Sequence, residues 1–237
     1  MRAITTALVV LLSVGTAAAQ SAPAAAQGRP AFELAQATVT ALTLAASIEQ
    51  SIDRIDRNRL GDQSGRFEAT TEARRALGRS QEASSLLGRP IGAPDGAIRK
   101  AAAAMRAPFN QLSSGLNDAI RTWEKLDRAS DDNEAVDLVR SSTALLANES
   151  PWERLGQATI GVTHALLDVE RAAVRGDLKS ARHLQLTKVE RETVIASLKK
   201  SFPRLSTNAR GGGRPAEASA TALFEFLNQP FANAEDP

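Results

Sequence analysis

A long apolar seam between residues 98 and 126 most constrains how this chain can fold. Apolar residues recur there at alternating steps of three and four through about four heptads, which is the spacing of a coiled-coil-like seam. They are Ile98, Ala102, Met105, Phe109, Leu112, Leu116, Ile120, Trp123 and Leu126. Such a stripe lies on one face of a helix and must pack lengthwise against other helices. Asp95 stands where an N-cap is expected.

Pro108 lies inside this seam. Proline removes one helical hydrogen bond and crowds the preceding turn. We therefore expect a kink or a break near residues 104–107.

Two further helices are expected before the seam. The first begins at Pro30, carries apolar residues at three- and four-residue steps, and ends at Gly61 after roughly 28 residues. The second covers about residues 67–87, with Phe67 among its main apolar residues. The segment 88–96 has the composition of a loop.

Helices after the seam are marked by their first residues. Asp131 begins one of them, at an acidic cluster that suits a helix N-terminus better than a calcium site. Ser150 is the expected N-cap of the next, with proline and glutamate at its first and third positions. Thr187 and Glu190 form a capping-box pattern that opens a helix ending before Pro203.

No strand-like alternation of apolar and polar residues occurs in the sequence. The chain is therefore expected to be all-α: an elongated antiparallel helical bundle of five to six helices with a short tethered C-terminal helix. The expected organisation is a cleaved signal peptide, a flexible lead-in, a helical bundle domain, a linker, a C-terminal helix and a loose tail. These cover residues 1–19, 20–30, 31–203, 204–215, 216–228 and 229–237.

The first nineteen residues have the pattern of a secretory signal peptide. Arg2 provides a positive start, a short apolar run follows, and Ala17-Ala18-Ala19 offers the small residues that a signal peptidase accepts. The run is shorter than the ~20 apolar residues that a spanning helix needs. We therefore expect an exported protein, periplasmic or secreted, with no transmembrane segment in the mature chain.

Composition narrows the chemistry that this chain can perform. Cysteine is absent, which excludes disulfides and thiolate metal sites. Aromatic residues make up only 4% of the chain, so nucleic acid is not an expected partner of this exported protein. The sequence also lacks the zinc motif HExxH, the serine motif GxSxG and a P-loop. No catalytic residues are predicted.

Charge is distributed unevenly along the chain. Residues 171–214 carry 11 basic and 3 acidic side chains, whereas residues 118–153 carry 4 basic and 9 acidic ones. The two segments could pair with each other inside the fold, and this is the expectation we favour. The alternative is a basic face for anionic lipid or polysaccharide. Its residues would be Arg171, Arg175, Lys179, Arg182, Lys188, Arg191, Lys199, Lys200 and Arg204.

The sequence offers one weak pair of cofactor ligands. Soluble periplasmic bundles can hold haem between a methionine and a histidine, and Met105 and His164 are the candidates here. Met105 lies on the core seam, where methionine usually fills space. His164 lies beside the apolar stripe of its helix, and His183 lies in the basic segment. No cofactor is therefore expected.

These observations favour a protein that acts by binding. The leading hypothesis is an envelope protein that binds a protein partner as an adaptor, accessory or sensor-like module. One alternative is a carrier of a small ligand or haem, with a cavity in the core near Met105, Phe109 and Trp123. Another is a binder of anionic envelope components through the basic face, and a third is an enzyme with a dispersed acid–base site.

Overall fold

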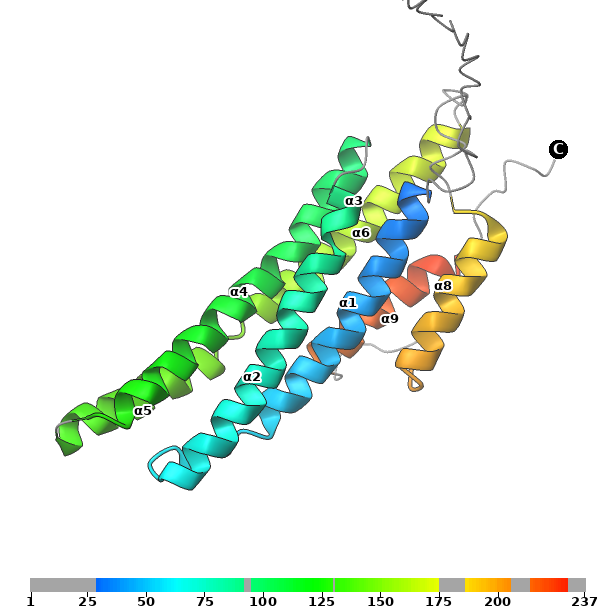
Figure 1. Ribbon diagram of the computed structural model, residues 1–237. Coiled ribbons are helices and arrows are strands. Elements are labelled where there is room, and N and C mark those ends of the chain that lie inside the picture. The colour runs from blue at the N-terminus through cyan, green and yellow to red at the C-terminus, as the bar shows by residue number, and fades with distance from the viewer. Residues whose placement is uncertain (1–28, 92–94, 130, 175–185, 206–213, 230–237) are drawn as a thin grey trace, which may run out of the picture.

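The computed structural model describes residues 29–91, 95–129, 131–174, 186–205 and 214–229 (Figure 1). All regular structure in these ranges is helical, which confirms the all-α prediction. The helices are α1 (Pro30–Asp53), η2 (Arg57–Arg59), α2 (Gln63–Leu86), α3 (Gly88–Ile91), α4 (Gly96–Leu126), α5 (Asp132–Leu146), α6 (Ser150–Val174), α8 (Lys188–Ser201) and α9 (Pro215–Leu227). The signal peptide expected over residues 1–19 lies outside the described residues.

Long helices lie side by side along one axis of the molecule (Figure 1). α1 packs on α2, α2 on α4, and α4 on α5 and α6. Contacts at both ends show that α2 and α4 are antiparallel, since Arg66 pairs with Asp127 at one end and Arg106 bonds to Ser84 at the other. α5 and α6 follow each other along α4, so this helix forms the spine of the bundle.

The apolar seam of α4 is confirmed. All nine of its predicted residues are buried, and Met105 and Phe109 are completely inaccessible to solvent. The helix runs from Gly96 to Leu126 through Pro108, so of the two predicted outcomes, a kink or a break, the break is excluded. Proline leaves only one helical hydrogen bond unmade, and the packing of α4 against α1, α2, α3, α5 and α6 outweighs that loss.

Most of the predicted helix starts are present. Oδ1 of Asp95 accepts the Ile98 amide at 2.9 Å, and Oδ1 of Asp131 accepts the Glu134 amide at 2.8 Å. Thr187 starts α8 with a complete capping box. Ser150 differs from expectation, because it is already the first helical residue of α6, and its hydroxyl accepts a hydrogen bond from the side chain of Gln111.

The boundaries between α1 and α4 differ from the predictions. α1 ends at Asp53 instead of near Gly61, because Asp56 accepts the amide of Asn58 at 3.0 Å and begins the short helix η2. The segment predicted as a loop includes α3 over residues 88–91. Phe67 is 74% exposed, since α2 uses small residues, chiefly alanine, to approach its neighbours closely.

The C-terminal helix is docked on the bundle. α9 packs against α6, α1 and α8, and α8 also packs on α1. Ala220 and Leu223 are fully buried, and Phe224 and Leu227 are nearly so. The tertiary structure thus joins α9 to α1 (Figure 1).

One described helix, α1, is long and apolar enough by length and composition to cross a membrane. Half of its most apolar window is buried inside the bundle. Leu34, Leu42 and Ile48 are completely covered by neighbouring helices. A central position in the bundle therefore accounts for the apolar composition of this helix.

Candidate functional site

The two candidate haem ligands are not brought together. Met105 is buried on α4, and its sulfur receives the hydroxyl of Thr159 on α6 at 3.8 Å. His164 follows Thr159 by five residues, which turns it about 140° around the helix axis. Its side chain is exposed to solvent. The structure therefore gives no support to a haem held between these two side chains.

The clefts found in the structure do not coincide with the core cavity suggested near Met105. Met105, Phe109 and Trp123 are at most 1% exposed, and the clefts described below are lined by other residues. Within the described ranges, no group of three or more His, Asp or Glu side chains is placed to hold a metal ion. His183 lies outside those ranges.

The proposed basic face is only partly assembled. Arg171, Lys188, Lys199, Lys200 and Arg204 are exposed. The ammonium group of Lys199 lies over the ring of Phe224, 5.6 Å from its centroid. Arg175, Lys179 and Arg182 lie outside the described residues.

Arg191 does not belong to an exposed face. Its guanidinium is half-buried and lies 3.4 Å from the carboxylate of Glu170 on α6. Burial raises the pKa of Glu170, and Arg191 counteracts part of that rise. Burial likewise lowers the pKa of Arg191. This arginine therefore joins α8 to α6. The prediction that placed it in the basic face is corrected.

The expected pairing of the two charged segments takes a different form. Arg191 pairs with Glu170, and Arg214 pairs with Asp53 at 2.9 Å, so both partners lie outside residues 118–153. In the acidic segment, Asp127 pairs with Arg66 of α2 at 2.7 Å. The order of the helices explains this, because α8 packs on α1 and α9 while α5 packs on α4.

A site that the sequence analysis missed surrounds Glu49 of α1. This carboxyl lies on the apolar stripe between Ile48 and Ile52, and the residue is only 7% exposed. Oε1 accepts the backbone amide of Ala216 at 2.9 Å. Oε2 is buried and has no hydrogen-bond partner among the described residues. The sequence did contain a signal for this site, because Glu49 is an acidic residue on a stripe whose other residues are apolar or small.

Glu49 acts as a cap for a helix far away in sequence. α9 begins with Pro215, and its N-cap residue Arg214 makes no capping hydrogen bond through its side chain. The first amides of a helix lack partners within the helix, and an acidic side chain there also interacts favourably with the helix dipole. Glu49 of α1 supplies the first turn of α9 with a hydrogen-bond acceptor and with a negative charge.

The surroundings of Glu49 raise the pKa of its carboxyl. Burial raises the pKa of Glu49 from 4.5 to about 6. The amide of Ala216 and the charge of Arg214 act in the opposite direction, while Asp53 and Glu217 raise it further. Near neutral pH this carboxyl therefore carries a charge in a place that disfavours it.

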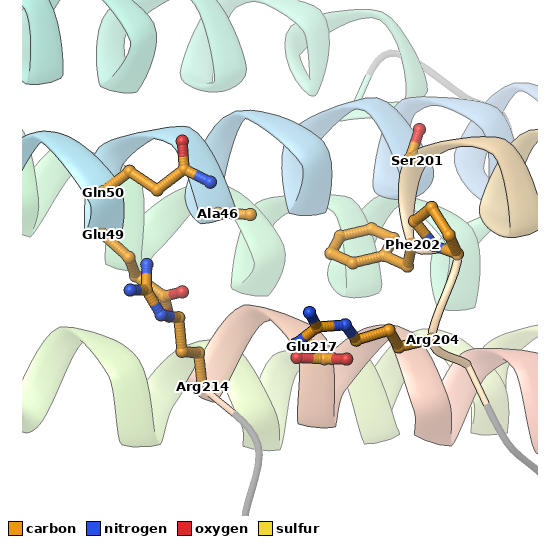
Figure 2. Close-up of a pocket in the computed structure, with 9 residues that line it drawn as sticks. Ala46, Glu49, Gln50, Ser201, Phe202, Arg204, Arg214 and Glu217 are labelled. Atoms are coloured by element: carbon orange, nitrogen blue, oxygen red, sulfur yellow. The ribbon is translucent and has the colours of Figure 1, made fainter.

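Two clefts meet at Glu49. The first, of about 420 Å³, lies between α1, the end of α8 and the start of α9. Figure 2 shows Glu49 and Arg214 at one end of it, with Ser201, Phe202 and Arg204 toward the other and Glu217 beside Arg204.

The second cleft, of about 440 Å³, lies between α1 and the junction of α5 with α6. Its lining includes Asp53, Glu149 and Trp152, together with the apolar side chains of Ile52 and Leu146. Glu49 and Arg214 line both clefts. The arrangement can bind charged groups by ion pairs and hydrogen bonds beside apolar surface, and volumes of this size suit small ligands or side chains.

Comparison of the chain with protein-family models, curated proteins and solved structures finds no match.

Proposed function

We propose that this protein is exported and acts by binding a protein partner of the cell envelope at the two clefts around Glu49. The observation that carries this proposal is the buried carboxyl of Glu49, which lines both clefts and keeps one oxygen without a hydrogen-bond partner among the described residues. Buried polar groups in stable folds are almost always hydrogen-bonded. A partner that completes this site fits both the geometry and the charge.

The lining of the clefts supports binding as the mode of action. It offers carboxylates, guanidinium groups, an amide and the indole of Trp152 beside apolar side chains. A few polar groups set in a mainly apolar lining are typical of binding sites. The two clefts lie next to each other along α1, so neighbouring side chains of one partner segment can occupy both.

Export is the second part of this proposal, and the pattern of residues 1–19 supports it. Mass spectrometry of the protein recovered from the envelope fraction tests it. We expect a mature chain that begins at Gln20. An intact Met1 terminus on cytoplasmic protein would contradict export.

Partner binding is tested by site-specific photo-cross-linking in living cells. A photoreactive residue replaces Gln50, which is exposed at the first cleft, and a matched control replaces Lys125, which is exposed at the far end of α4. We expect one discrete adduct from position 50 that is absent from position 125 and reforms with the purified partner. Equal adducts from both positions, or none from position 50, would overturn the proposal.

A second candidate function rests on exposed cations near the end of α8. Lys199, Lys200 and Arg204 are all exposed there. They could attract anionic lipid or polysaccharide, and such binding would weaken with salt. Sedimentation with anionic vesicles at low and high salt tests this, with neutral vesicles as the control.

A further inference from the structure

The oxygen Oε2 of Glu49 is the starting point of this inference. Glu72 Oε2, Trp123 Nε1 and Gln111 Oε1 are also buried without hydrogen-bond partners among the described residues. Trp123 and Gln111 are neutral, the carboxylate of Glu72 already pairs with Arg54 and Arg75, and none of the three residues lines the two clefts. Glu49 is a carboxyl, it lies at the meeting point of the clefts, and a buried anion needs compensation more than a neutral group does.

Glu49 already satisfies one oxygen within the fold. Oε1 receives the amide of Ala216, whereas Oε2 is covered by the surrounding residues and has no hydrogen-bond partner among those described. The group that best completes such a site carries both a donor and a positive charge, because charge-assisted hydrogen bonds are the strong ones. A protonated amine and a guanidinium have both properties.

The second cleft provides the remaining features of a cation site. Asp53 and Glu149 add carboxylates to its lining, and Trp152 adds an aromatic ring. Carboxylates and aromatic faces both attract organic cations. Ile52 and Leu146 provide apolar surface on which the aliphatic stem of a lysine or arginine can lie.

The protein places one of its own guanidinium groups at this point. Arg214 lines both clefts, and its charge interacts with Glu49. It forms an ion pair with Asp53 at 2.9 Å, and both side chains are more than half exposed. Exposed pairs of this kind are weak, so an incoming cation competes with a partner that is held loosely.

We propose that Glu49 is the anionic centre of a recognition site for one lysine or arginine side chain of the protein partner. This inference rests on the proposed function and names the chemistry that the partner presents. The aliphatic stem lies over the apolar lining, and the charged head displaces the side chain of Arg214 to reach the carboxylate of Glu49.

The test uses N-acetyl-arginine amide as the probe, with N-acetyl-citrulline amide as its neutral match. Binding to the purified protein is followed by NMR shifts of the Ala216 amide and the Trp152 indole. We expect the arginine probe to bind and the citrulline probe to bind at least about tenfold more weakly, since one charge-assisted hydrogen bond is lost. Equal binding of the two probes, or no binding of the arginine probe, would overturn the proposal.

The variant Glu49→Gln keeps an acceptor for Ala216 and removes the charge. We expect it to weaken arginine binding about tenfold for the same reason, while Asp137→Asn, an exposed acid on α5, changes nothing. Unchanged affinity in Glu49→Gln would contradict the assignment.

The wild-type protein provides a measurement that does not depend on a variant folding. Affinity for the arginine probe should rise as pH increases through about 6, where Glu49 ionises. Other charged groups line the clefts from α1, the segment after it, the α5–α6 junction, the segment after α8 and the start of α9. They are Asp53, Arg57, Glu149, Arg204, Arg214 and Glu217. A flat profile would contradict the role of Glu49.

Competition separates this inference from the proposed function. If the arginine probe abolishes the adduct formed from position 50, the partner uses this site. If the adduct forms but resists the probe and survives Glu49→Gln, the partner binds elsewhere on the cleft, and this inference alone fails. If the probe binds without affecting any adduct, the ligand is a free small cation, and the assignment to a partner side chain is wrong.

Discussion

Polar groups lie between helices in two regions of this molecule, and the regions differ in whether every polar group has a hydrogen-bond partner. At the α2–α4 contact, Ser80 donates to the carbonyl of Phe109 at 2.6 Å, and Ser113 donates to Ser80 at 2.9 Å. Arg106 donates to Ser84 at 2.9 Å in the same contact. At the α1–α9 contact, Glu49 receives one amide and leaves its second oxygen without a partner among the described residues.

The difference separates a structural contact from a candidate site. A network whose polar groups are hydrogen-bonded to one another fixes how two helices pack and requires no group from another molecule. A buried carboxyl beside two clefts, with one oxygen that has no hydrogen-bond partner among the described residues, is the feature on which the proposed binding rests. Changes at the first region should therefore alter stability alone, whereas changes at the second should alter both pH dependence and binding.

The largest expected effect comes from truncating the core at the α2–α4 contact. Phe109→Ala removes a completely buried ring and should destabilise the protein by about 3–5 kcal/mol. Phe67→Ala is the matched control, because this ring is 74% exposed, and it should change stability by less than about 0.5 kcal/mol. Chemical denaturation measures both. Similar losses in the two variants would contradict the burial described here.

The next effect is a dependence of stability on pH that comes from Glu49. A carboxyl whose pKa is raised from 4.5 to about 6 favours the folded state when it is protonated. The stabilisation that protonated Glu49 provides is complete below about pH 4.5 and is lost as pH rises through about 6. The free energy of unfolding then falls by about 2 kcal/mol.

The variant Glu49→Gln isolates this contribution. Its unfolding free energy should lack that decline, while Asp137→Asn should retain it. Denaturation curves recorded between pH 4 and pH 8 provide the measurement. The same decline in Glu49→Gln would show that another group is responsible.

Removing the hydroxyl of Ser80 should have a smaller and pH-independent effect. Ser80→Ala leaves the carbonyl of Phe109 and the hydroxyl of Ser113 without this partner, at a cost of about 1–2 kcal/mol. Ser85→Ala, at an exposed position of the same helix, is the control. If Ser80→Ala also weakened binding of the arginine probe, the separation between the two regions would fail.

The smallest effect on stability is expected for Arg214→Ala. Its ion pair with Asp53 is exposed, so its loss should cost less than about 1 kcal/mol. The pKa of Glu49 should nevertheless rise further above about 6, because the charge of Arg214 now lowers it. A carbon-13 NMR titration of the Glu49 carboxyl measures this. An unchanged or lowered pKa would show that Arg214 does not influence the site.

Local features of the sequence determined much of the fold. The seam from Ile98 to Leu126 and the caps at Asp95, Asp131 and Thr187 could be predicted because each depends on residues close together in the chain. Boundaries were less certain where a short side chain could start another turn, as Asp56 does after α1. The continuity of α4 through Pro108 depended on packing against other helices.

The candidate site was decided by the tertiary structure alone. Glu49 and Ala216 are separated by 167 residues, and no local pattern connects them. Their contact exists because the apolar face of α9 is buried against α1 and α6, which brings the uncapped start of α9 to an acid on α1. The sequence by itself determined the helices and their buried faces, since these depend on short-range periodicity and capping. Which charged side chains meet, and which of them line the two clefts, depended on how those faces pack together.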